Sequence, residues 1–145
     1  MDIGKLNDPI DLAPGEWIED IPALPGVRVK VRSTNFKPYE SGIQGLARRL
    51  GKKMNTDDGI VKFSLATGKV LADHILLDWD LSAADEDVAI THDGEPLAYS
   101  ADNAMLVLTA NDKHGLGKAY RNGVEWAGDR VADRLRARAA EVAGN

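Results

Sequence analysis

Carboxylate and hydroxyl side chains crowd around Trp79 in the middle of the chain, an arrangement that suggests a bound cation. They are Asp78, Asp80, Ser82 and Glu86. A helix–loop–helix calcium loop needs oxygen ligands at alternating positions, Gly at its sixth position and a bidentate Glu at its twelfth. Counted from Asp78, those two positions hold Ala83 and Ala89. The spacing does not fit, so the sequence predicts no metal and no other cofactor here.

Other residue types that perform catalysis are scattered or lack the required spacing. The histidines, His74, His92 and His114, are far apart, and no two lie four residues apart as a helical zinc site needs. The run Gly115–Lys118 lacks the four-residue spacer and the final Ser or Thr of a phosphate-binding loop. No Gly-x-Ser-x-Gly elbow occurs, and the chain has no cysteine. The sequence therefore predicts that the protein is not an enzyme.

The length and the net charge of the chain favour some of the remaining classes of protein over others. The 145 residues suit one domain, and we expect a flexible arm over residues 1–14 and a single globular domain over residues 15–145. The polar N-terminus predicts no secretory signal, and no apolar run approaches the roughly 20 residues of a membrane span. A net charge of −5 disfavours nucleic acid, whose phosphates repel an acidic surface. A cytoplasmic location is expected, in keeping with the lack of cysteine.

Tryptophan and arginine are the residues that most often dominate protein–protein contacts. Trp126 flanks the apolar stripe of the last predicted helix, beside Arg130. Two interpretations stay open for it: a core-edge ring in a cation–π contact, or an anchor for a partner. Trp17 has the same ambiguity, whereas the apolar run before Trp79 favours a core position. The candidate partner-binding residues are Trp17, Trp126, Arg130, Arg134, Met105 and Leu108.

Hydrophobic periodicity predicts an α+β fold. Trp17–Ile21 and the alternating Val27–Arg32 predict an N-terminal antiparallel β-hairpin with the valines inward. Apolar spacings of three and four residues predict about four helices, over 38–50, 56–74, 100–108 and 116–142. Residues 75–81 either extend the second helix or form a strand. Turn signals on both sides of residues 88–91 predict that these pair back as a short β-ribbon between helices two and three. We expect the hairpin to pack against the helix bundle.

The same residues set the helix ends and the inward faces. Pro38 suits a first turn, Gly51 a stop, and Thr56 and Ser100 suit N-caps. His74 is expected to be a hydrogen-bonded packing histidine. The positions expected to face the core are Tyr39, Ile43, Leu46, Ala47 and Leu50 in the first helix; Ile60, Phe63, Thr67, Val70, Leu71 and His74 in the second; Ala101, Ala104, Met105 and Leu108 in the third; and Tyr120, Val124, Ala127, Val131, Leu135 and Val142 in the last.

One composite pattern runs through the middle of the chain: a helix, a short apolar run, Asp-Trp, an acidic gap, Asp-Gly-Glu-Pro, Tyr-Ser and another helix. Its marker residues are Asp78, Trp79, Asp93, Gly94, Pro96, Tyr99 and Ser100. In this pattern the chain resembles the tail assembly chaperones of long-tailed (siphovirus-type) bacteriophages, over about residues 15–110. Members of that family often have Trp-Glu-Gly where this chain has Trp79-Asp80-Leu81, followed by a shorter acidic gap. The longer gap leaves room for the ribbon.

The resemblance implies a non-enzymatic protein that coats the tape measure protein, keeps its hydrophobic helices from aggregating and helps recruit tail tube subunits. The expected partners are the tape measure protein and the tail tube protein, with self-association left open and with neither nucleic acid nor a membrane. The expected location is the cytoplasm of a bacterial host, and the mature virion should lack the protein. Two alternatives stay open: a structural tail or connector completion protein of the virion, and a small enzyme or metal-dependent regulator that uses the carboxylates of residues 78–87.

Overall fold

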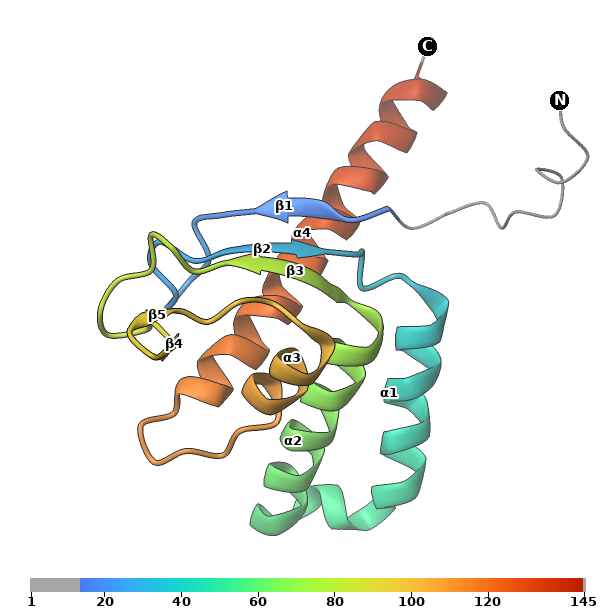
Figure 1. The fold of residues 1–145 in the computed structure, drawn as a ribbon. Coiled ribbons are helices and arrows are strands. Elements are labelled where there is room, and N and C mark those ends of the chain that lie inside the picture. Colours follow the sequence, from blue (N-terminus) through green and yellow to red (C-terminus); the bar gives the residue numbers. More distant parts are fainter. Residues whose placement is uncertain (1–13, 145) are drawn as a thin grey trace, which may run out of the picture.

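A small sheet lies across one end of the helices (Figure 1). The computed structural model describes residues 14–144, so residues 1–13 of the predicted arm at 1–14 lie outside the described part of the chain. Three strands, β1 (Glu16–Ile18), β2 (Arg28–Val31) and β3 (Leu76–Asp80), form an antiparallel sheet in the order β1-β2-β3. The helical segments are α1 (Lys37–Leu50), the 3₁₀ helix η2 (Gly51–Asn55), α2 (Asp57–His74), α3 (Ala101–Leu108) and α4 (Leu116–Ala143). The predicted α+β class and the N-terminal hairpin are confirmed.

The hairpin forms as the alternation of residues predicts. Val27, Val29 and Val31 are buried, while the basic residues between them stay partly exposed. Residues 76–80, which the sequence leaves open between helix and strand, form β3 and extend the hairpin to three strands. In the β2–β3 register, Val29 lies opposite Trp79 and Lys30 opposite Asp78. Pairing with β2 therefore decides the conformation of a segment whose local pattern is ambiguous.

Local capping chemistry fixes the ends of the helices. The Thr56 hydroxyl accepts a hydrogen bond from the Gly59 amide at 3.0 Å, and the Ser100 hydroxyl accepts one from the Asn103 amide at 3.0 Å. Pro38 lies in the first turn of α1, and Gly51 caps its C-terminus with a positive φ of 49°. The predicted starts of α2 and α3 and the predicted end of α1 are confirmed.

A ribbon between α2 and α3 is present as predicted, as two short strands, β4 (Thr91–His92) and β5 (Glu95–Pro96). Of the residues 88–91 that were expected to form it, only Thr91 belongs to a strand. The Leu97 amide continues the pairing by donating to the Ile90 carbonyl at 2.9 Å. Asp93 and Gly94 form the turn between the strands, with φ angles of 52° and 80°. Positive φ at both central residues is the hairpin turn that Asp-Gly favours.

The core lies between the sheet and the helices, and most of the predicted inward positions belong to it. The corrections concern residues near helix ends. Ile60 is 57% exposed and Val142 is 76% exposed, and Ala101 and Leu135 also lie at the surface. Buried residues of α4 end at Ala132, and the helix continues past β1 into solvent (Figure 1). The apolar spacing predicts burial of these four residues, but no neighbouring element covers the helix turns on which they lie.

Helix α2 approaches α3 closely, which is possible because Gly68 has no side chain. A Cβ at Gly68 would overlap the carbonyl oxygen of Leu108 and would lie 2.7 Å from Cδ of Arg121. Backbone atoms cannot move aside as a flexible side chain can. This crossing therefore requires glycine, whereas a Cβ at Gly45 in α1 would meet no atom within 4 Å.

A matched pair of Gly→Ala variants tests this packing. We expect Gly68→Ala to lower the free energy of unfolding by about 1–3 kcal/mol, because the added methyl forces α2 and α3 apart. We expect Gly45→Ala to raise it by about 0.5–1 kcal/mol, because alanine is the better helix former and its methyl finds open space. Urea denaturation of both variants measures the difference, and equal effects of the two substitutions would contradict the close crossing.

Candidate functional site

The marker residues around Trp79 build a structural unit. Trp79 is buried, its indole Nε1 donates to the Leu97 carbonyl at 2.8 Å, and the Tyr99 ring meets it edge-on at 5.4 Å. The Tyr99 hydroxyl donates to the Leu76 carbonyl at 3.3 Å. These contacts attach the segment after the ribbon to β3. The prediction that Trp79 is a core residue is confirmed.

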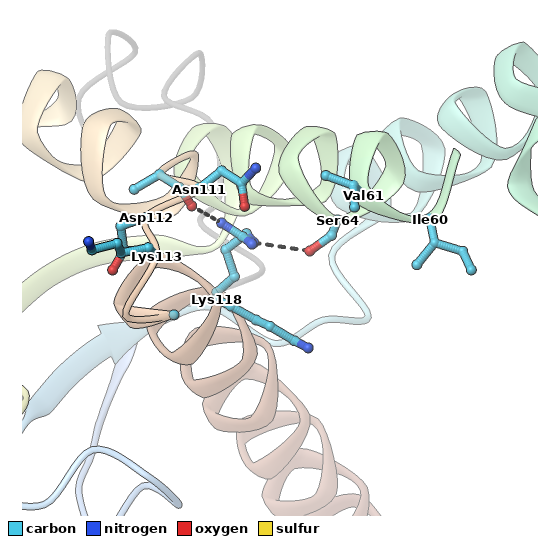
Figure 2. Close-up of a pocket in the computed structure, with 10 residues that line it drawn as sticks. Ile60, Val61, Ser64, Asn111, Asp112, Lys113 and Lys118 are labelled. Atoms are coloured by element: carbon cyan, nitrogen blue, oxygen red, sulfur yellow. Dashed lines mark hydrogen bonds between the residues drawn. The ribbon is translucent and has the colours of Figure 1, made fainter. Parts of the chain in front are cut away.

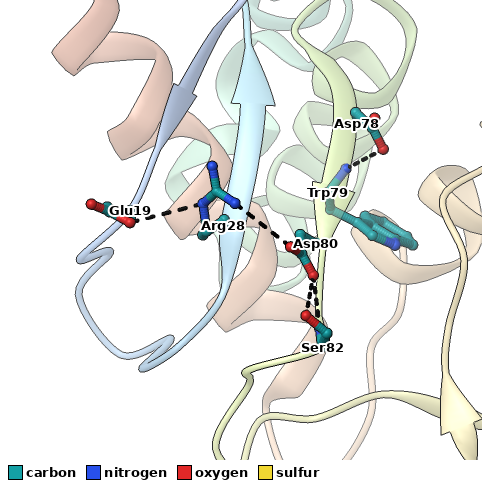
Figure 3. A network of polar contacts seen from close by, with 6 residues as sticks. All are labelled: Glu19, Arg28, Asp78, Trp79, Asp80 and Ser82. Carbon is teal, nitrogen blue, oxygen red and sulfur yellow. Dashed lines mark hydrogen bonds and ion pairs between the residues drawn. The ribbon is translucent and has the colours of Figure 1, made fainter.

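The carboxylates beside Trp79 are occupied by local hydrogen bonds (Figure 3). Asp80 accepts from the Ser82 hydroxyl at 2.6 Å and from the Ser82 amide at 2.9 Å, and these bonds lower the pKa of Asp80. Arg28 lies 3.6 Å from Asp80 and 3.8 Å from Glu19, which links β3 to β2 and to the end of β1. Asp78 accepts from the Trp79 amide at 2.8 Å. Among residues 14–144, no group of three or more His, Asp or Glu side chains gathers where it could hold a metal ion.

The long acidic gap after β3 is attached to the last helix. The Tyr120 hydroxyl of α4 donates to the Val88 carbonyl at 2.7 Å, and burial raises the pKa of Tyr120 to about 12. The Asp85 amide also donates to the Pro25 carbonyl at 3.0 Å. The gap is therefore held at both of its sides, by the β1–β2 turn and by α4.

The candidate partner-binding residues divide into exposed, half-buried and buried positions. Trp17 is 38% exposed with the Arg28 guanidinium 4.9 Å from its ring, and Trp126 is half-buried with Arg130 at 5.3 Å. The cation–π contact that one of the two interpretations of Trp126 includes is thus present. Arg130 and Arg134 are exposed, and Arg130 pairs with Asp133 at 2.8 Å.

The two apolar candidates on α3 differ. Met105 is half-buried, whereas Leu108 is fully buried in the core. The prediction that Leu108 contacts a partner is therefore corrected, because its side chain is covered by the protein itself. The large apolar side chain that α3 exposes is instead Leu106, at 70% exposure.

A surface depression gathers residues that the sequence does not bring together. The α2–α4 hollow, as we call it, lies between the start of α2, the loop after α3 and the start of α4, and has a volume of about 380 Å³ (Figure 2). Ile60, Val61 and Ser64 of α2 face the loop residues across it. Its lining residues are Ile60, Val61, Ser64, Ala110, Asn111, Asp112, Lys113, Gly115, Lys118 and Arg121.

Arg121 is the buried charged residue of this hollow. Its guanidinium donates to the Ala110 carbonyl at 2.6 Å, to the Leu108 carbonyl at 3.3 Å and, through Nε, to the Ser64 hydroxyl at 3.2 Å. It therefore ties the end of α3 and the following loop to α2 and α4. The sequence analysis missed Arg121, although it lies three residues before Val124 on the buried face of α4.

Asp112 caps the start of α4. Its two carboxylate oxygens accept from the Gly117 amide at 2.8 Å and from the Leu116 amide at 3.0 Å, and these bonds lower the pKa of Asp112. The sequence analysis missed this cap as well. An Asp a few residues before a predicted helix was the available signal.

Two further hollows adjoin the first. One is almost wholly apolar, measures about 360 Å³, and lies on the other side of the loop; its lining is Ile90, Leu97, Leu106, Val107, Ala110, Asp112, Leu116 and Gly117. The other, of about 230 Å³, continues the α2–α4 hollow along both helices and shares Ile60, Ser64 and Arg121 with it. Its lining includes Thr67, whose buried hydroxyl oxygen has no hydrogen-bond partner among residues 14–144.

Glu125 closes this continuation on the α4 side. The residue is exposed as a whole, but its carboxylate tip accepts a hydrogen bond from the Tyr39 hydroxyl at 3.3 Å. Loss of water around the carboxylate raises the pKa of Glu125, and repulsion from Asp129 raises it further, while the Tyr39 bond opposes both effects. Asp129 itself accepts from the Thr34 hydroxyl at 2.6 Å.

Comparison with known protein families, with curated proteins and with solved structures finds no match to this chain. Within residues 14–144, no helix combines the length and apolar character that crossing a membrane requires. The described surface contains apolar hollows, and charged residues line the α2–α4 hollow.

The role of Arg121 is tested by removing its donors. We expect Arg121→Met to lower the free energy of unfolding by about 2–3 kcal/mol, because buried carbonyls of residues 108 and 110 lose their partner. Lys118→Met, one turn away and exposed, should change it by less than about 0.5 kcal/mol. Urea denaturation measures the free energy of unfolding of both variants. A similarly small loss in both would show that water replaces the guanidinium as the donor to these carbonyls.

The raised pKa of Glu125 predicts a pH dependence of stability. The folded state holds the Glu125 proton more tightly than the unfolded state, so this group's contribution is fully present below the ordinary pKa near 4.5 and is lost as the pH rises through the raised value. Glu125→Gln cannot ionise, but its amide oxygen still accepts from Tyr39. We therefore expect its stability relative to the wild type to increase between pH 4 and pH 7 in urea titrations. The control Glu141→Gln, at an exposed position near the end of α4, should show no such trend.

Proposed function

We propose that this protein is a tail assembly chaperone of a long-tailed bacteriophage, which binds the tape measure protein without catalysis. The observation that carries the proposal is the unit around Trp79. The Asp78–Trp79 pair, the Asp93–Gly94 turn, Tyr99 and the Ser100 cap are residues of the family resemblance. Trp79 and Tyr99 contact each other and join β3 to residues 97–99, while the turn and the cap shape the same segment before and after this contact. A shared structural role gives a reason for these residue types to occur together.

The surface of the helices supports the same proposal. Ile60, Val61 and Leu106 are large apolar side chains exposed beside hollows. Amphipathic partner helices are held in this way by grooves that cover their apolar faces. The net charge of −5 favours solubility of a long filament coated by many copies.

Co-expression tests the proposal. The chain should co-purify with the tape measure protein encoded beside it, and the tape measure protein should move from the insoluble to the soluble fraction when the chain is present. The control is co-expression with a soluble helical protein of similar length that is unrelated to phage tails. Unchanged solubility together with a lack of co-purification would exclude the chaperone function.

Mass spectrometry of purified particles separates the proposal from its alternative. A chaperone is released before the virion matures, so its peptides should be absent from purified virions and present in the infected-cell lysate. Peptides at a stoichiometry comparable to other tail proteins would instead assign the chain to the virion as a tail or connector completion protein.

A further inference from the structure

We infer that the α2–α4 hollow and its continuation form the docking groove for an amphipathic helix of the partner that carries acidic side chains beside its apolar face. This inference rests on the proposed function and specifies the surface and the partner chemistry. Three kinds of observation lead to it: the exposed apolar side chains of the groove, the charge of its rim and the state of its backbone groups.

The apolar part of the groove comes from the first turns of α2. Ile60 is 57% exposed and Val61 is 44% exposed, and both line the α2–α4 hollow. The continuation adds Phe63 and Leu71. Covering exposed side chains of this size removes apolar surface from water, which is the main driving force of association.

The rim of the hollow is basic on an acidic protein. Lys113, Lys118 and Arg121 line it together with a single carboxylate, Asp112, which gives a local excess of two positive charges where the whole chain carries −5. The continuation adds the carboxylate of Glu125, so the groove as a whole keeps an excess of one positive charge when Glu125 is ionised. The Asp112 carboxylate is already engaged by two backbone amides of α4. Lys113 and Lys118 are exposed and remain available to acidic groups. Charge complementarity therefore favours a partner segment with Asp or Glu residues.

The backbone groups around the hollow favour a helix over an extended strand as the occupant. The carbonyls of Leu108 and Ala110 accept from Arg121, and the amides of Leu116 and Gly117 donate to Asp112. A docked strand gains its affinity from free main-chain groups of its host, and these groups are already satisfied. A helix satisfies its own backbone and contributes side chains alone, which is what this groove can receive.

Two matched pairs of variants test the groove by co-purification with the tape measure protein. Lys113→Glu/Lys118→Glu reverses the rim, and its control Lys52→Glu/Lys53→Glu makes the same change of charge on exposed residues of η2. Ile60→Asp places a charge in the apolar part, and its control Val142→Asp does so at the far end of α4. We expect each groove variant to weaken capture at least tenfold and each control to change it less than twofold. Urea denaturation confirms that each variant is folded.

Photocrosslinking gives a second measurement that does not depend on weakened binding. Ile60→p-benzoylphenylalanine should crosslink to the tape measure protein, and Val142→p-benzoylphenylalanine should not. Mass spectrometry should map the crosslink to a segment with apolar residues spaced by three and four positions and with Asp or Glu beside them. A crosslink to a basic or extended segment, or to the tail tube protein instead, would overturn the inference.

The outcomes separate the inference from the proposed function. If the wild type captures the tape measure protein and the groove variants capture it equally well, the function stands and the groove is wrong. If Leu106→Asp alone abolishes capture, the partner occupies the apolar hollow beyond the loop, and the groove is again wrong. If the wild type itself captures nothing, the proposed function fails, and the inference fails with it.

Discussion

The buried guanidinium of Arg121 is the contact on which the arrangement of the helices depends. It reaches from α4 to the carbonyls that end α3 and begin the next loop, and to a hydroxyl of α2. A carbonyl that loses its helical partner at a C-terminus must find another donor when it is buried. Arg121 supplies that donor for the Leu108 carbonyl, donates as well to the Ala110 carbonyl of the following loop, and so fixes the direction in which the chain leaves α3. Gly68 makes the same crossing possible by leaving room for the Leu108 carbonyl and for Cδ of Arg121.

A different set of contacts holds the sheet in place. It involves few residues, and each of them makes several contacts. Trp79 buries its ring under the sheet and uses its single donor on the Leu97 carbonyl, while Tyr99 packs on the ring and donates to β3. The Leu76 carbonyl of β3 accepts from Tyr99, so this main-chain acceptor of an edge strand is not free to pair with another strand. The other edge strand, β1, is only three residues long, which limits the same risk.

How well the sequence predicted each feature depended on how local its cause is. The valines of β2 and the caps Thr56 and Ser100 act within a few residues, and the sequence predicted them correctly. The conformation of residues 76–80 depended on pairing with β2, so the local pattern left it open.

Apart from the Asp112 cap, whose partners lie four and five residues away, the features that sequence reasoning missed depend on distant parts of the chain. Ile60 was expected in the core because periodicity cannot show that no element covers the first turns of α2. Arg121 went unnoticed because its partner Ser64 lies 57 positions away along the chain. The α2–α4 hollow brings together residues from three segments, and no motif marks such a set. The packing of the helices alone brings these residues together.

The two halves of α4 show why charge alone does not locate a binding surface. The half from Arg130 onward is rich in arginine, but three of its four arginines are paired with nearby carboxylates, Arg130 and Arg136 with Asp133 and Arg138 with Glu16. Exposed pairs of this kind contribute little free energy and leave little net charge for a partner. The half before Arg130 has only Lys118 and Arg121, yet Lys118, with Lys113 of the preceding loop, is exposed at the rim of an apolar hollow. A binding surface needs apolar area for affinity, charge that a partner can reach for selectivity, and a rigid support that holds both in place. The first half of α4, which Arg121 holds in place, borders a surface with all three properties.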